Sequence, residues 1–184
     1  MVLKRAAPAA KKGVNVMKRL EVESGRFVSP GAEISVLETF YERQYDMVQK
    51  GNTDLVTLKL IMLGNALDFI DLIKRSLGVE LDNTEKSIPL FEEVMDALSR
   101  GILERSLFDN SNSIAKKAGA YLGLLIIANI GGSWEDTSEG PAILIEGREA
   151  FVLDFAEKRL ASGSELNVMD YYRSVRAVAP AVKN

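Results

Sequence analysis

The stretch from Ala118 to Trp134, which reads AGAYLGLLIIANIGGSW, constrains the fold more than any other part of the sequence. Its apolar run from Tyr121 to Ile130 is about half as long as the roughly 20 residues that a membrane-spanning helix needs. A helix that is apolar on every side must instead be surrounded by protein. We therefore predict a central helix over about 112–130 that ends at Gly131-Gly132, with Trp134 fixing the next segment against it.

Two glycines lie one helical turn apart inside this run, at Gly119 and Gly123. Glycine costs about 1 kcal/mol relative to alanine in a helix, so a packing reason for both is expected. The Gly-x-x-x-Gly spacing marks membrane dimerisation only in a spanning segment. No lysine follows the glycines as a phosphate-binding loop requires. The spacing therefore predicts close packing inside a protein core.

Apolar residues at spacings of three and four predict further helices on both sides of the central one. Strand-like segments flank Gly147-Arg148 and predict a hairpin. Leu20–Val28 has the pattern of a short hairpin or edge strand. The expected fold is α+β and predominantly helical, with five to six helices around the central helix. The other elements are expected at 31–50, 54–77, 88–105, a short helix ending at Gly163 and a last helix capped by Ser164, with strands at 142–146 and 149–153.

Charge is distributed unevenly along the 184 residues, whose net charge is -3. Residues 1–30 hold seven basic and two acidic side chains, which gives +5 and leaves -8 for the rest. We interpret 1–17 as a flexible basic arm, 18–177 as a single globular domain and 178–184 as a frayed end. A basic arm on an acidic body can bind nucleic acid or an anionic membrane surface, although a solvated tail is the commoner outcome.

The sequence contains neither cysteine nor histidine. Disulfides, thiolate metal sites and histidine-based catalytic triads are therefore excluded. No secretory signal is visible in the first 20 residues, because charges interrupt them before an apolar core forms. These features predict a cytoplasmic protein without a cofactor and make an enzyme the less favoured class.

Candidate binding residues gather after the central helix. Glu135, Asp136 and Glu139 form an acidic, turn-rich segment beside Trp134, the only tryptophan. Paired carboxylates can serve metal or acid–base chemistry. The cluster Glu92-Glu93-Asp96 falls on an amphipathic helix, where such carboxylates usually form the solvated face.

Two further candidates lie closer to the C-terminus. Arg148 at the predicted hairpin tip could clamp an anion, although such tips are more often solvated. Tyr171 is expected to face outward beside Arg173 and Arg176, while Tyr172 faces the core. An outward tyrosine near arginines is a typical interface residue. The basic pairs of the arm have no aromatic residues between them, which gives little support to nucleic-acid stacking.

Three segments in order resemble small bacterial α+β proteins, some of which are proposed to be immunity or immunity-like proteins of polymorphic toxin systems. They read GVELDNTEKSIPLFEEVMDAL, AGAYLGLLIIANIGGSW and GPAILIEGREAFVLDFAEKRLASG, and the resemblance covers about residues 78–177. Such proteins often carry a glutamate after the glycine of Tyr-Leu-Gly, where this chain has Leu124. The resemblance implies the fold and supplies no catalytic residues.

The sequence thus favours a non-enzymatic binding protein, immunity-like in the form that the resemblance implies, with an acidic surface for a basic protein partner. Two alternatives stay open. One is a metal-dependent enzyme using Glu135, Asp136 and Glu139. The other is a nucleic-acid or membrane-surface adaptor that acts through the basic arm.

Overall fold

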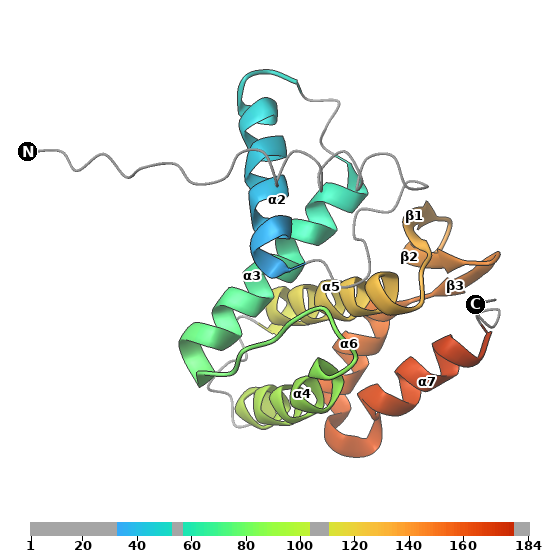
Figure 1. Cartoon of the computed structure of the whole chain (residues 1–184). Helices are drawn as coiled ribbons and strands as arrows, with labels where there is room; N and C mark the ends of the chain where they lie inside the picture. The colour runs from blue at the N-terminus through green and yellow to red at the C-terminus, as the bar shows by residue number, and fades with distance from the viewer. Residues whose placement is uncertain (1–32, 53–56, 104–110, 179–184) are drawn as a thin grey trace, which may run out of the picture.

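The computed structural model describes residues 33–52, 57–103 and 111–178. Within them six α-helices and a small three-stranded antiparallel sheet form an α+β fold that is predominantly helical, as predicted (Figure 1). The predicted arm at 1–17 and the predicted hairpin or edge strand at Leu20–Val28 lie outside the described residues, as does the predicted frayed end at 178–184 apart from Val178, which is helical. The elements in chain order are α2 (Ile34–Gln49), α3 (Leu58–Leu77), α4 (Ser87–Leu103), α5 (Ser111–Asn129), β1 (Ser133–Thr137), β2 (Gly140–Ile145), β3 (Arg148–Ala150), α6 (Val152–Ser162), the short 3-10 helix η3 (Gly163–Glu165) and α7 (Val168–Val178).

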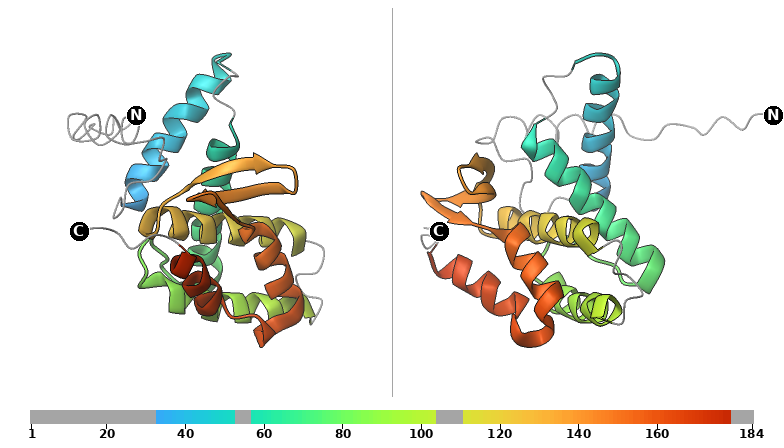
Figure 2. Two further views of the ribbon diagram at one scale, coloured as in Figure 1. Left: turned by 90° about the vertical axis from the view of Figure 1, so that its right-hand side faces the viewer. Right: turned by 180° about the vertical axis from the view of Figure 1, so that it is seen from behind.

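Helix α5 is the centre of the fold, as the sequence predicts. Every residue from Ala118 to Ala128 is buried. Helix α3 and helix α6 make the most extensive contacts with α5. In Figure 1, α5 runs across the middle of the molecule, with α2 and the sheet above it and α4 and α7 below. The views in Figure 2 show the same layering from the side and from behind.

The two glycines of α5 let neighbouring groups reach its backbone. A Cβ atom added to Gly119 would lie 2.8 Å from the Cα atom of Leu153 in α6. One added to Gly123 would lie 2.3 Å from the Trp134 ring. Both distances are too short for a real contact, so only glycine fits at either position. The predicted reason for the glycines and the predicted role of Trp134 are therefore confirmed.

Local signals explain where α3 and α4 begin and end. The Thr57 hydroxyl accepts a hydrogen bond from the Leu60 backbone N–H at 3.3 Å, and Gly78 ends α3 in the left-handed conformation. Before α4, the Asp82 carboxylate accepts hydrogen bonds from the Thr84 backbone N–H and from the hydroxyls of Thr84 and Ser87. This network fixes the turn that leads into α4.

The sheet has the strand order β1-β2-β3, and Trp134 of β1 packs on Gly123 of α5. Trp134 lies opposite Ile143, and Ile143 lies opposite Ala150, so these three buried residues share the inner face. Glu146 and Gly147 form the turn between β2 and β3 with positive φ angles. A third strand stabilises the hairpin, because two strands alone are marginal in water.

Several predicted boundaries and one predicted segment differ from the structure. The acidic segment after Trp134 was expected to be a loop, but residues 133–137 form β1 because they pair with β2. The strand expected at 149–153 ends at Ala150, since Val152 already begins α6 against Gly119. The last helix begins at Val168, where Asn167 rather than Ser164 accepts a hydrogen bond from the first turn.

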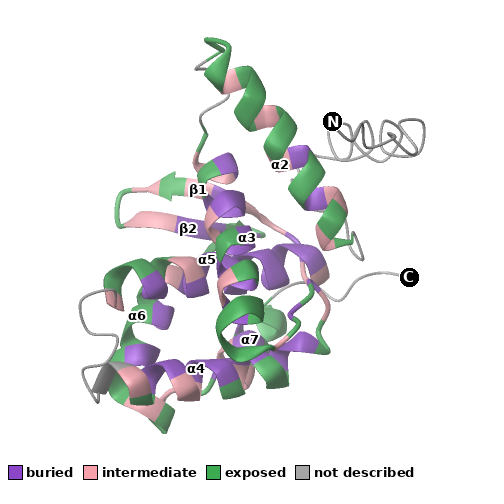
Figure 3. Cartoon of the chain, turned by 90° about the vertical axis from the view of Figure 1, so that its left-hand side faces the viewer, coloured by how far each residue is buried: buried purple, intermediate pink, exposed green. Residues whose placement is uncertain are grey.

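Helix α2 is the least covered helix of the described chain. Only Leu37 and Phe40 are buried among its 16 residues. Figure 3 shows that the end of α2 farther from the body is almost entirely exposed. The apolar stripe that predicts this helix continues through Tyr45, which is exposed, and Val48, which is partly buried.

Candidate functional site

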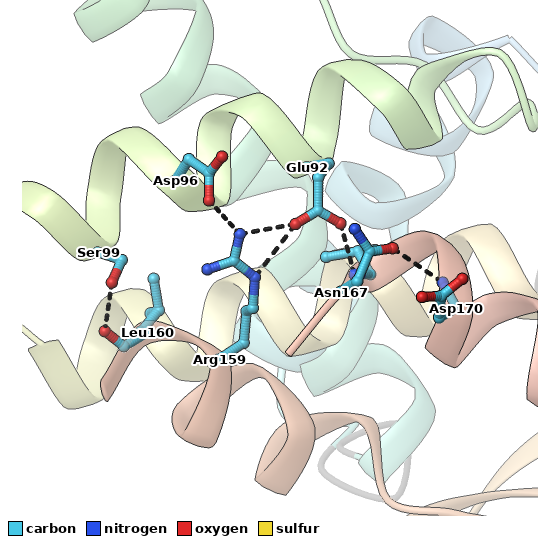
Figure 4. Close-up of polar contacts among 8 residues, drawn as sticks. Glu92, Asp96, Ser99, Arg159, Leu160, Asn167 and Asp170 are labelled. Atoms are coloured by element: carbon cyan, nitrogen blue, oxygen red, sulfur yellow. Dashed lines mark hydrogen bonds and ion pairs between the residues drawn. The ribbon is translucent and has the colours of Figure 1, made fainter. Parts of the chain in front are cut away.

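An arginine inside the helical layer is the most unusual chemical feature of the described residues. Arg159 extends from α6 toward α4, and its side chain is 0% exposed (Figure 4). Its Nη2 donates to the Glu92 carboxylate at 2.6 Å and to the Asp96 carboxylate, while Nε donates to Glu92 at 3.2 Å. Glu92 and Asp96 lie one turn apart on α4, so both face the same guanidinium. Arg159 therefore joins the two helices.

The same contact surface carries two further hydrogen bonds. The second oxygen of Glu92 accepts a hydrogen bond from the Val168 backbone N–H at the start of α7. The Ser99 hydroxyl donates to the Leu160 carbonyl oxygen at 2.8 Å. Helices α4, α6 and α7 are thus held in a fixed relation by polar groups (Figure 4). We call Glu92, Asp96 and Arg159 the ionic cluster.

The charges in the ionic cluster do not balance. One guanidinium faces two carboxylates, which leaves a net charge of about -1. Burial alone would lower the pKa of Arg159, but the hydrogen bonds and charges of Asp96 and Glu92 outweigh it and raise the pKa. Arg159 therefore stays charged. Its Nη1 is buried and has no hydrogen-bond partner among the described residues.

A groove of about 350 Å³ lies beside the ionic cluster, between the end of α3 and the outer face of α4. Its volume is at the lower end of the range for ligand pockets. Two of its leucines are unusually exposed for large apolar residues, Leu77 at 45% and Leu90 at 39%. The groove residues are Leu77, Val79, Leu90, Glu93, Val94, Asp96, Ala97 and Arg100.

Asp96 belongs to both the groove and the ionic cluster. Its side chain is about two-fifths exposed, so the unbalanced charge of the cluster reaches solvent there. Glu93 adds a second carboxylate at the same wall, and Arg100 is the only basic residue of the groove. The groove thus combines an apolar floor with an acidic side.

The residues predicted around Trp134 do not form a common site. Trp134 is buried against Gly123 and has no free face for a ligand. Glu135 accepts a hydrogen bond from Ser133 and lies 3.8 Å from the Lys59 ammonium group. Asp136 and Glu139 are exposed, one in β1 and the other in the following turn.

The two remaining candidates are also separate. Arg148 is exposed at the start of β3, next to the turn of the hairpin. Tyr171 is half-buried, and its ring stacks on Phe155 with the centroids 4.0 Å apart. Burial raises the pKa of Tyr171 to about 12, with a contribution from Asp154. Tyr171 thus packs between α6 and α7 instead of facing fully outward, whereas Tyr172 is buried as predicted.

Two general properties of the described residues bear on function. None of the helices in these ranges is both long and apolar enough to cross a membrane. Within the same ranges, no three carboxylate side chains come close enough together to hold a metal ion.

The ionic cluster was missed in the sequence because its carboxylates have the spacing of a solvated helix face. The structure corrects that interpretation for Glu92, which is partly buried, and for Asp96. The sequence of α6 did contain a signal for this cluster. Arg159 takes one position of the stripe that also holds Val152, Phe155 and Ala156 and faces the core. A basic residue inside an apolar stripe indicates a buried carboxylate partner.

Comparison with protein-family models gave no match, and comparisons with curated proteins and with solved structures gave none either. The resemblance to immunity-like proteins therefore stays a prediction.

Proposed function

We propose that the chain is a non-enzymatic binding protein whose groove on α4 takes an apolar side chain from a basic protein partner. The observation that carries the proposal is the pairing of two exposed leucines with an acidic wall. A leucine or phenylalanine of the partner would cover Leu77 and Leu90. A neighbouring lysine or arginine would pair with Glu93 or Asp96.

In such a contact the apolar and the charged groups contribute differently to binding. Burial of apolar surface contributes about 25 cal/mol per Å², which makes the leucines the main source of affinity. Pairs between exposed charges contribute less than about 1 kcal/mol and mainly set specificity and the rate of association. Binding should therefore weaken with salt without disappearing.

The ionic cluster supports the groove in two ways. It holds α4 against α6 and α7, so the groove wall is formed before a partner arrives, which lowers the entropic cost of binding. The cluster also leaves the charge of Asp96 only partly neutralised, because the Arg159 guanidinium pairs with both Glu92 and Asp96. An incoming cation thus meets a carboxylate that is not fully neutralised.

An immunity-like role would be one form of this proposal, with a basic toxin as the partner, and its support is the resemblance alone. The metal-dependent alternative gains no support from the described residues. Glu135 interacts with Ser133 and Lys59, and Glu135, Asp136 and Glu139 do not form a group that could hold a metal ion. The adaptor alternative depends on the basic arm, which lies outside the described residues.

An array of immobilised peptides would test the proposal with the full chain as the probe. The array would hold three sets of peptides: leucine or phenylalanine flanked by lysines, the same apolar residues flanked by glutamates, and lysines without an apolar residue. We expect retention on the first set alone. Equal retention on all three sets, or on none, would contradict the proposal.

A matched pair of variants would locate the binding. Leu90 and Leu144 are exposed to nearly the same extent, at 39% and 37%, but Leu144 lies in the sheet away from the groove. Leu90→Gln should abolish retention and Leu144→Gln should preserve it. Glu93→Lys should weaken retention of the lysine-flanked peptides, whereas Glu157→Lys on α6 should not. An unchanged signal from Leu90→Gln would place the binding elsewhere.

A further inference from the structure

A second surface, on helix α2, carries a different chemistry from the groove. The rings of Tyr41 and Tyr45 stack with centroids 6.2 Å apart and an angle of 22° between their planes. Tyr41 is fixed because its ring packs on the backbone of Gly64, where an added Cβ would lie 2.7 Å away. Tyr45, by contrast, is 50% exposed. The pair thus presents an aromatic ring to solvent from a rigid base.

Two glutamates lie on the same helix as this ring pair. Glu38 and Glu42 are exposed and lie one turn apart on α2. Glu38 lies three residues before Tyr41 and Glu42 three residues before Tyr45, so each glutamate neighbours a tyrosine on the helix surface. Burial raises the pKa of the Tyr41 hydroxyl, and the negative charge of Asp68 on α3 raises it further. The hydrogen bond and the charge of Glu80 raise the pKa of Lys74 on α3, and the charge of Glu38 makes a smaller contribution to this shift. We call Glu38, Tyr41, Glu42 and Tyr45 the α2 platform.

The platform has the chemistry of a cation-binding surface. A lysine ammonium or an arginine guanidinium over a tyrosine ring gains about 0.5–1 kcal/mol at an exposed site. A carboxylate at the rim adds an ion pair of similar size. A single cation would thus bind weakly, and an occupant needs either several basic residues or a high local concentration.

The chain itself contains an occupant that meets both conditions. Residues 1–30 carry a net charge of +5, with adjacent basic pairs at Lys11-Lys12 and Lys18-Arg19, and they directly precede α2 in the sequence. About 14 residues separate Arg19 from Glu33, and the general relation for flexible chains gives roughly 20 Å for that number of residues. Tyr45 lies about 17 Å along the helix axis from Ile34, since a helix rises 1.5 Å per residue. The reach therefore matches the distance.

We propose that the basic residues between Lys11 and Arg26 bind in cis to the α2 platform, with a lysine or arginine on the exposed face of Tyr45, on the side of Glu42 and Glu38. A short tether gives an effective concentration of the order of 1 mM, so a contact with an intrinsic Kd of about 1 mM is formed about half of the time. Charge complementarity selects this occupant over a second copy of α2, whose own carboxylates would repel. This inference does not depend on the groove.

The absence of cysteine makes a site-specific spin label straightforward in the full chain. A label on Gln49→Cys lies one turn beyond Tyr45 on α2, and a label on Ser138→Cys lies in the turn after β1. With the label on residue 49, we expect the NMR amide signals of residues 11–26 to fall roughly twofold or more when about half of the molecules are docked. With the label on residue 138 they should keep their intensity.

Two controls separate the proposed contact from its competitors. Glu38→Gln with Glu42→Gln should restore the arm signals, as should high salt, whereas Glu146→Gln with Glu149→Gln on the hairpin should not. A mixture of spin-labelled and isotope-labelled chains reports contact between molecules. Equal broadening from both label positions, insensitivity to the α2 variants, or broadening only in the mixture would overturn the proposal. Failure of the peptide array would leave it unaffected.

Discussion

Two contact surfaces between helices in this molecule use opposite chemistry. Helix α5 packs on α3, α6 and the sheet through apolar side chains and two glycines. The Tyr121 ring stacks on Phe69 and meets Phe91 edge to face. Helix α4 meets α6 and α7 through an arginine, two carboxylates and a serine. The first surface lies at the centre of the fold, and the second lies beside the groove.

The difference indicates what each surface contributes. Apolar contacts are non-directional and provide most of the stability of a domain. Buried ion pairs add little net stability, since desolvation offsets their attraction, but removal of one partner is costly. The ionic cluster therefore fixes the position of α4 more than it stabilises the fold. It also maintains a charge at Asp96 that an apolar contact could not provide.

Replacement of the arginine should have the largest effect on stability. Arg159→Met leaves Glu92 and Asp96 without their buried cation, and we expect the free energy of unfolding to fall by about 3–5 kcal/mol. Urea unfolding followed by circular dichroism measures the change. The triple variant Arg159→Met, Glu92→Gln and Asp96→Asn should regain most of the loss, because no uncompensated charge remains. If the triple variant is no more stable than the single one, the cluster is not held together by its charges.

At the apolar surface around α5, an added methyl group should lower stability by overpacking. Gly123→Ala should lower the free energy of unfolding by about 2–3 kcal/mol, because overpacking against Trp134 outweighs the roughly 1 kcal/mol gained in helix propensity. The Trp134→Leu background provides the control, since the ring that the new methyl group would meet is gone. The Gly123→Ala substitution should cost much less there than in the original chain. The same cost in both backgrounds would show that the tryptophan is not what excludes a side chain.

The apolar surface around α5 also contains the polar hydroxyl of Tyr121, which tests how much one buried hydrogen bond contributes there. The Tyr121 hydroxyl donates to the Asp82 carbonyl oxygen at 2.6 Å, and burial raises the pKa of that hydroxyl. Tyr121→Phe keeps the ring but leaves the carbonyl oxygen without its donor, which should cost about 1–2 kcal/mol. The matched variant Tyr45→Phe on α2, whose hydroxyl forms no hydrogen bond to another residue that the structure describes, should change stability much less. Equal effects would contradict a specific role for the buried bond.

The smallest expected effect is a pH dependence at the start of α4. Partial burial acts to raise the pKa of Asp82, but hydrogen bonds from Ser87 and Thr84 and the charge of Lys86 outweigh it and lower the pKa. The folded pKa thus lies below the unfolded value of about 3.9. The resulting stabilisation is present above about pH 4 and is lost as the pH falls through the folded pKa.

Urea unfolding between neutral and acidic pH would measure this dependence. Asp82→Asn should be less stable than the original chain at neutral pH, and the difference should shrink in acid. A difference that stays constant over the whole pH range would mean that the carboxylate is not the group responsible.

The sequence predicts most of the fold, because the helices have strong and continuous apolar periodicity. The central helix, its glycines and the role of Trp134 follow from the residues from Ala118 to Trp134 alone. Strand β1 was missed since its alternation is short and its acidic residues resemble a turn. Its strand conformation depends on pairing with β2, which is a contact between segments that local pattern does not encode.

The candidate site was predicted far less well. The groove depends on Leu77 at the end of α3 lying near α4, and neither helix alone has an unusual exposed face in the sequence. The ionic cluster joins residues 63 and 67 positions apart in the chain. Arg159 could have been found from its place in an apolar stripe, but its partners could not have been chosen among the many carboxylates.

One measurement tests the central claim that the groove on α4 is the recognition surface. Methyl NMR spectra of the full chain would be recorded while the best lysine-flanked apolar peptide from the array is added. We predict saturable shifts at Leu77, Leu90 and Val94, no shift at Leu144, and loss of the shifts in the Leu90→Gln variant. Shifts confined to the hairpin or to α2, with the groove methyl groups unchanged, would contradict that claim.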